Sequence, residues 1–214
     1  MESVAKNKIL ISLLILLSVI FCSCSQVSTR IDNSFFYVVF DYVNSKDFPE
    51  TRGAVYIETT DDIRRIDSII IKNNESNLEW EIDEPFLYST KERSYTGYSN
   101  LISADNTKFP NGFYELKIIN KNQEEHDSFF TVDYDTELYN LRLTQMQQKL
   151  KTIQAEENIC IYTEDNRILY FGNRSEELDS RSEIYEHYNN AFSYRSVWIA
   201  KNAVCLFPVE YIIQ

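Results

Sequence analysis

Residues 34–43 read SFFYVVFDYV, and this stretch decides the fold class. Aromatic and β-branched residues favour strands over helices, so the stretch predicts a β-strand. Residues 44–50 (NSKDFPE) follow it with polar side chains and Pro49, a composition typical of a turn. The chain is therefore expected to be mainly β, with its first strand here.

Short strands separated by turn signals continue from this point. Further strands are predicted in residues 54–60, 65–73, 78–82, 109–120 and 128–134. Residues 84–108 are longer and less regular. Six or seven short strands over about 100 residues favour an antiparallel β-sandwich, here placed in residues 34–134.

The order of features in this part resembles bacterial immunoglobulin-like or fibronectin-type modules. Such modules often carry a mid-domain tryptophan, a Pro-x-Gly-x-Tyr turn before a strand, and a closing phenylalanine strand. The matching residues are Trp80, then Pro110, Gly112 and Tyr114, and finally Phe129-Phe130. The resemblance covers residues 34–133 and implies an immunoglobulin-like sandwich, although the Cys-Trp-Cys spacing of true immunoglobulin domains is absent. A shared fold implies no function.

The periodicity changes after residue 135. Residues 136–157 place apolar side chains at helical spacing, and Asp135 or Thr136 can cap the start of that helix. A hairpin (158–173), a second helix (175–192) with a Ser180-x-x-Glu183 capping-box pattern, and another hairpin (195–213) follow. This α-β-β-α-β-β order predicts a small α+β domain in residues 135–214. Alternatively, the first helix packs on the sandwich and the two parts form one unit.

The N-terminus predicts export. Lys6 and Lys8 precede an uncharged apolar run, residues 9–21, which is short for a membrane span and typical of a signal peptide. Small residues and two cysteines follow, in the order Cys22-Ser23-Cys24-Ser25. The alternatives are an ordinary signal peptide cleaved near Ser23 or Ser25 and an uncleaved anchor.

An aliphatic run that ends in a small residue and then cysteine resembles the lipobox of bacterial lipoproteins. The resemblance implies a signal peptide in residues 1–24, acyl chains on Cys24, and a tether in residues 25–33 that holds the folded part at the membrane. Cys22 fits less well because the bulky Phe21 precedes it. Ser25 after the lipidated cysteine implies the outer membrane rather than the inner membrane.

Charge and motifs narrow the range of functions. A net charge of −12 makes nucleic acid a poor partner and leaves acyl chains as the expected membrane contact. No catalytic motif, phosphate loop, dinucleotide fingerprint or zinc spacing is present in the body of the chain, so no catalytic residue, cofactor or metal site is predicted.

Two sets of residues remain as candidate sites. Cys160 and Cys205 lie in apolar strand-like runs, and a disulfide and two buried free thiols are equally expected. Tyr88, Tyr95 and Tyr98 cluster in the irregular stretch. They are expected either to bind a ligand such as a sugar or a protein partner, or to cover the end of the sandwich core with their rings.

The lipoprotein resemblance and the lack of a catalytic motif favour a non-enzymatic binding or assembly module of the cell envelope. Its expected partner is an envelope protein or a glycan. The alternatives are an envelope enzyme that acts on glycans through paired carboxylates and a purely structural lipoprotein.

Overall fold

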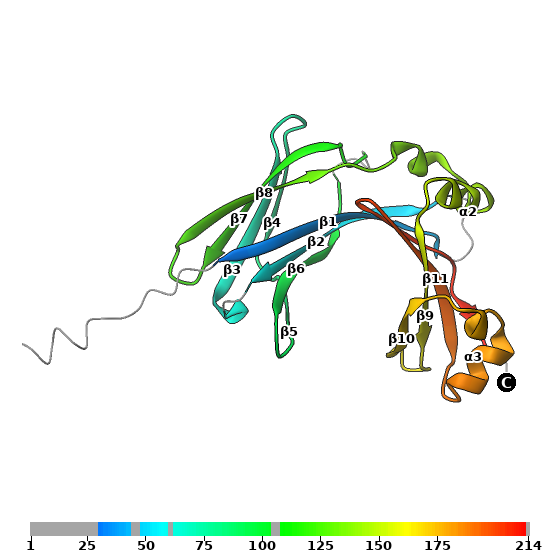
Figure 1. Ribbon diagram of the computed structural model, residues 1–214. Coiled ribbons are helices and arrows are strands. Elements are labelled where there is room, and N and C mark those ends of the chain that lie inside the picture. The colour runs from blue at the N-terminus through cyan, green and yellow to red at the C-terminus, as the bar shows by residue number, and fades with distance from the viewer. Residues whose placement is uncertain (1–29, 44–47, 60–61, 104–107, 213–214) are drawn as a thin grey trace, which may run out of the picture.

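Residues 30–43, 48–59, 62–103 and 108–212 are described by the computed structural model, which is mainly β as expected (Figure 1). The predicted signal peptide and Cys24 lie outside these residues. The strands are β1 (Ile31–Asp41), β2 (Glu50–Thr59), β3 (Ile66–Asn73), β4 (Leu78–Ile82), β5 (Phe86–Ser89), β6 (Ser94–Leu101), β7 (Gly112–Asn120), β8 (Glu125–Val132), β9 (Glu156–Tyr162), β10 (Ile168–Asn173), β11 (Ser193–Ala200), β12 (Ala203–Leu206) and β13 (Glu210–Tyr211). The helical elements are α2 (Leu143–Thr152), α3 (Arg181–His187) and the 3₁₀ turns η2 (Ile63–Arg65), η4 (Thr136–Asn140) and η5 (Glu176–Leu178).

These strands form two sheets. The larger sheet, sheet A, has nine strands in the order β10-β9-β11-β12-β1-β2-β6-β5, with β13 pairing with β11. The smaller sheet, sheet B, has the order β4-β3-β7-β8. Among the described strands, every pairing is antiparallel except that of β1 with β12, which is parallel.

Sheet A crosses the domain boundary predicted at residue 134. The first strand, β1, hydrogen-bonds on one side with β2 and on the other with β12, which lies near the end of the chain. The C-terminal hairpins therefore extend the sheet that the N-terminal strands begin, and they do not build a sheet of their own.

The main hydrophobic core lies between the two sheets. Alternate residues of β1, including Phe36, Val38 and Phe40, point toward sheet B and are buried against its inner face. Tyr114 and Phe130 of sheet B stack on the ring of Phe36, with ring centroids 5.6 and 5.5 Å away. This packing of two apolar sheet faces is what makes the arrangement sandwich-like.

Helices extend the covering of this face of sheet A. Met146 and Leu150 of α2 are fully buried in the main core. A second core forms where Ile184 of α3 meets Ile159 and Ile161 of β9. Sheet B, α2 and α3 thus all lie on one side of sheet A, and the opposite side forms the inner surface of an arch (Figure 1).

The predicted helix in residues 136–157 is wrong in extent. The structure has η4, then extended backbone at Leu141, then α2, and β9 already begins at Glu156. Leu141 leaves the helix because its carbonyl oxygen accepts a hydrogen bond from the Tyr42 hydroxyl, at 2.8 Å. Asp135 caps η4 as expected, since its side chain accepts from the backbone N–H of Glu137.

The predicted bounds of several other elements differ from those in the structure. The second helix is shorter than predicted, because the Ser180–Glu183 capping box starts α3 and does not lie inside a longer helix. Residues 84–108, expected to be irregular, contain the β5–β6 hairpin. The first strand, β1, already begins at Ile31, within the residues 25–33 that were predicted as a tether. Both predicted C-terminal hairpins are present, as β9–β10 and β11–β12.

Candidate functional site

A cleft of about 380 Å³ lies on the concave face of sheet A. Within the described ranges, no helix or second sheet packs on this face (Figure 1). Seven of the nine strands contribute side chains to the cleft. Its lining residues are Tyr37, Val39, Arg52, Ala54, Tyr56, Ser99, Cys160, Tyr162, Ile168, Phe171, Val197, Ile199, Val204 and Leu206.

The lining comes from strands that are apolar on both faces. In β1, Phe36 and Val38 enter the core, while Tyr37 and Val39 point the other way into the cleft. In β12, Cys205 enters the core and its neighbours Val204 and Leu206 line the cleft. A strand with one solvated face would alternate apolar and polar residues, so these unbroken apolar runs reflect a concave face that is itself apolar.

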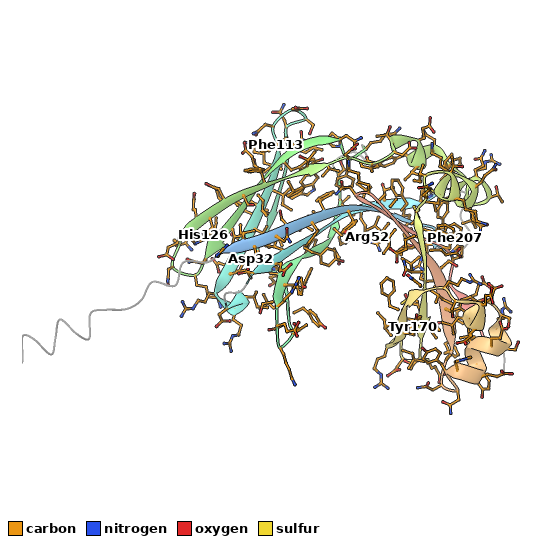
Figure 2. The ribbon with its side chains drawn as sticks, viewed as in Figure 1. Asp32, Arg52, Phe113, His126, Tyr170 and Phe207 are labelled. Carbon is orange, nitrogen blue, oxygen red and sulfur yellow. The ribbon has the colours of Figure 1, made fainter. Side chains whose placement is uncertain are left out.

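One charged cluster lies at the cleft. Asp41 accepts hydrogen bonds from two arginines, from Nη1 of Arg52 at 3.0 Å and from Nη2 of Arg195 at 2.7 Å. Arg195 also donates through Nε to the carbonyl oxygen of Phe207, at 2.9 Å. Figure 2 shows Arg52 at the inner side of the bend between the two arms of the arch. The carboxylate of Asp41 is largely buried, so the two guanidinium groups supply the charge that offsets its desolvation.

Three titratable side chains of the cleft have raised pKa values, with burial as the main cause. Burial raises the pKa of the Cys160 thiol, and burial together with a hydrogen bond to Cys160 raises the pKa of Tyr162. Burial also raises the pKa of Tyr56. A thiol or phenol with a raised pKa is a hydrogen-bonding group and a poor nucleophile at neutral pH, so these side chains are suited to contact a ligand.

A buried amide lies beside the cleft on the same face. Asn158 pairs in register with Val197 on one side and with Asn173 on the other. It is only 3% exposed, and its side-chain nitrogen has no hydrogen-bond partner among the described residues. A buried N–H donor without a partner destabilises the folded state. The side-chain amide of Asn158 is thus a polar group beside the cleft that a hydrogen-bond acceptor would stabilise.

None of the three predicted tyrosines lines the cleft, and two of them lie beside it. Tyr88 and Tyr95 are cross-strand partners in the β5–β6 hairpin, with ring centroids 6.4 Å apart. By register they lie on the same face as Tyr56, and Tyr88 is 61% exposed. Tyr98 pairs with Val55 and lies on the other face. The structure therefore brings two of the three together at the edge of the concave face.

The two body cysteines are free thiols in the structure, and both are buried. Cys160 on β9 pairs with Arg195 of β11, whereas Cys205 on β12 pairs with Trp198. The two cysteines are thus separated by a whole strand, and Cys205 enters the core while Cys160 lines the cleft. A disulfide needs Cα atoms within about 7 Å and side chains that point toward each other, so this arrangement contains no disulfide.

A second surface lies on the outer face of sheet B. Phe113 and Phe129 are exposed there, with ring centroids 5.3 Å apart, in a groove of about 680 Å³. Five of the ten residues that line this groove are charged, against one of fourteen in the cleft of sheet A. Charged side chains are well solvated, so a ligand that covers the sheet B groove removes less apolar surface from water. The cleft of sheet A is therefore the stronger candidate for a binding site.

Sequence reasoning missed the cleft, because it depends on pairings between distant strands. Arg52, Tyr162 and Phe171 carry no motif in the sequence. The described residues contain no group of three or more His, Cys, Asp or Glu side chains placed to hold a metal ion. None of the described helices is long and apolar enough to cross a membrane.

Comparison with known proteins adds no family to this picture. No protein-family model and no curated protein matches the chain.

Proposed function

We propose that the protein is a lipid-anchored lipoprotein of the cell envelope whose folded part is a non-enzymatic binding module. Acyl chains on Cys24 hold it at the membrane, with the outer membrane as the expected location. The concave cleft of sheet A binds a ligand whose body is largely apolar. The lipobox-like N-terminal sequence supports the anchor, and the concave cleft of sheet A supports the binding function.

The observation that supports the binding function is an apolar sheet face on which no described helix or second sheet packs. Burial of apolar surface is worth about 25 cal/mol per Å², so a ligand that fills the cleft is stabilised without any strong polar contact. Aromatic residues from three strands of sheet A line the cleft, Tyr37 of β1, Tyr162 of β9 and Phe171 of β10. A concave, mostly apolar cleft with a few polar groups is the usual form of a ligand site.

A second binding function belongs to the sheet B groove. Phe129 is 68% exposed beside Phe113, and both stand next to the carboxylates of Glu115 and Asp127. Exposed rings next to hydrogen-bonding groups suit a glycan or an envelope protein. The expected glycan or protein partner is therefore assigned to this groove, as a role additional to that of the cleft.

The cleft is tested by photolabelling of the full chain in isolated membranes with a neutral aryl diazirine. The labelled sites are then mapped by peptide mass spectrometry. We expect labelling to be concentrated on residues 159–171 and 195–206 and to fall several-fold in Phe171→Ser. The matched control is Phe129→Ser, which removes an exposed phenylalanine of sheet B and should leave cleft labelling unchanged. Labelling of the cleft no stronger than that of sheet B would refute the binding role.

The anchor is tested separately. Mass spectrometry of the N-terminal peptide from membrane fractions should show a diacyl or triacyl group on Cys24. Cys24→Ala should remove both the acyl mass and the membrane association. An unmodified N-terminus that begins beyond Cys24 would show that the protein is secreted without a lipid, and the cleft would then act in a freely diffusing protein.

A further inference from the structure

Resting on the proposed binding function, we infer that the ligand of the cleft is a linear aliphatic carboxylate, a free fatty acid, with its carboxylate on Arg52.

The charge of the cleft selects an anion. Arg52 is the only charged residue among the fourteen that line it. Behind it, Arg52 and Arg195 share the single carboxylate of Asp41, so the three side chains carry one net positive charge. Glu50, the cross-strand partner of Asp41, is exposed at the start of β2 and is not among the lining residues. In a chain of net charge −12, the charged group facing this apolar cleft is therefore a cation.

The guanidinium of Arg52 has more N–H donors than its hydrogen bond to Asp41 uses. Its Nη1 is bound to Asp41, at 3.0 Å, and this contact fixes the position of the group. An arginine has five N–H donors arranged to match a carboxylate in a bidentate pair. The Arg52 side chain retains 29% exposure, which leaves room for an acceptor from a ligand. A carboxylate bound here would face a preorganised partner.

Aliphatic side chains form a row that starts at Arg52. Arg52 pairs in register with Val39, Val39 with Val204, and Val204 with Ile199. Neighbouring strands lie about 4.8 Å apart, so this row runs about 14 Å across sheet A from the charged group. A straight row with a cation at one end matches an extended alkyl chain with an acidic end better than it matches a compact ring system.

The test compares two photoreactive probes of equal chain length, a diazirine-bearing fatty acid and the corresponding fatty alcohol. Each is added at the same mole fraction to neutral phosphatidylcholine vesicles that carry the full chain, and labelled peptides are mapped by mass spectrometry. We expect the acid to label the cleft peptides about tenfold more than the alcohol, the gain typical of a hydrogen bond to a charged group.

Three variants identify the source of this preference. Arg52→Gln should reduce the acid-to-alcohol ratio to near one, and Arg52→Lys should restore part of it, because the charge returns without the bidentate geometry. The control Arg93→Gln removes an exposed arginine near the β5–β6 hairpin, paired with Glu58, and should leave the ratio unchanged. Thermal unfolding of each variant confirms that the fold is retained.

The outcomes separate the inference from the function on which it rests. Equal labelling of the wild-type cleft by acid and alcohol would overturn the carboxylate inference and leave an apolar binding site. An acid preference that survives in Arg52→Gln would also overturn it. Labelling by neither probe above the level of sheet B would refute both the inference and the proposed binding function.

Discussion

Asp41 and Arg195 form an ion pair of 2.7 Å although 154 positions separate them in the chain. Asp41 ends β1, Arg195 lies in β11, and β12 runs between these two strands in sheet A. Because Arg52 of β2 binds the same carboxylate, this one side chain links β1 with β2 and, across β12, with β11 at the bend of the arch. It also holds Arg52 at the cleft.

Asp41→Asn should therefore destabilise the protein strongly. The substitution leaves two partly buried guanidinium groups without their counter-ion, a loss of about 3 kcal/mol. Urea unfolding measures this as a lower midpoint. The matched control is Asp165→Asn, which breaks the exposed pair with Arg167 and should cost less than about 1 kcal/mol. Equal effects from both variants would contradict the structural role given to Asp41.

Gly97→Ala should destabilise the packing of β6 against β2 near the edge of sheet A. Gly97 has a φ of +153°, and a Cβ there would overlap the backbone carbonyl oxygen of Val55. The rings of Tyr56 and Phe86 pack across this position, 5.5 Å apart. We expect a loss of at least about 2 kcal/mol in the free energy of unfolding. Gly112→Ala, with φ +136° but only ordinary van der Waals contacts around its Cβ, at 3.5 Å or more, should lose less.

Ser180→Ala should destabilise α3 by removing its N-cap. The Ser180 hydroxyl accepts from the backbone N–H of Glu183 in a complete capping box, and Ile184 in the same helix is fully buried in the second core. Loss of an N-cap of this type costs about 1 kcal/mol. Ser175→Ala is the control, since Ser175 stands before η5 without a side-chain cap bond. A smaller effect at Ser180 than at Ser175 in thermal unfolding would contradict this assignment.

Stability should fall at alkaline pH. Burial raises the pKa of the Cys205 thiol from 9.0 to about 12, so the folded state keeps this proton where the unfolded state loses it. The stabilisation is complete below pH 9 and is lost as pH rises toward 12, at up to about 1.4 kcal/mol per pH unit for this group. Burial likewise raises the pKa values of Tyr42, Tyr114 and Tyr134, which add to the decline.

The measurement is the free energy of unfolding between pH 8 and pH 11 in the wild type and in Cys205→Ala. The variant should show a shallower slope above pH 9 because one proton fewer is released on unfolding. The comparison uses slopes, so any cavity left by the smaller side chain does not affect it. Parallel slopes in the two proteins would contradict the buried state of Cys205.

Most strands could be predicted from the sequence because strand propensity is local. Residues 54–60 and 78–82 carry their patterns within a few positions, and the turn residues Asn111-Gly112 mark the start of another strand, β7. The pairing of β1 with β12 could not be predicted in this way, since it joins segments about 160 residues apart through backbone hydrogen bonds that carry no side-chain signature. Hence the sequence allows either two domains that divide at residue 134 or one unit, and the structure shows that sheet A has strands from both parts.

The break in the first helix had a similar cause. The apolar spacing of residues 136–157 is helical, but Tyr42, almost a hundred positions earlier, binds the carbonyl oxygen of Leu141 and fixes an extended residue there. For the cleft, the available signal was the lack of alternation in residues 34–43, since Tyr37 and Val39 are apolar or aromatic on the face opposite Phe36 and Val38. Such a run predicts two covered faces, whereas among the described residues no helix or second sheet packs on the concave one.

The central claim, that the concave cleft is the binding surface, is tested most directly by carbene footprinting of the full chain with and without hexadecanoic acid. A water-soluble diazirine reports the exposure of each side chain. We expect several-fold protection of Tyr37, Tyr162 and Phe171 on addition of the acid, and unchanged labelling of Phe113 and Phe129 on sheet B. Unchanged labelling in the cleft, or protection of the sheet B rings alone, would contradict it.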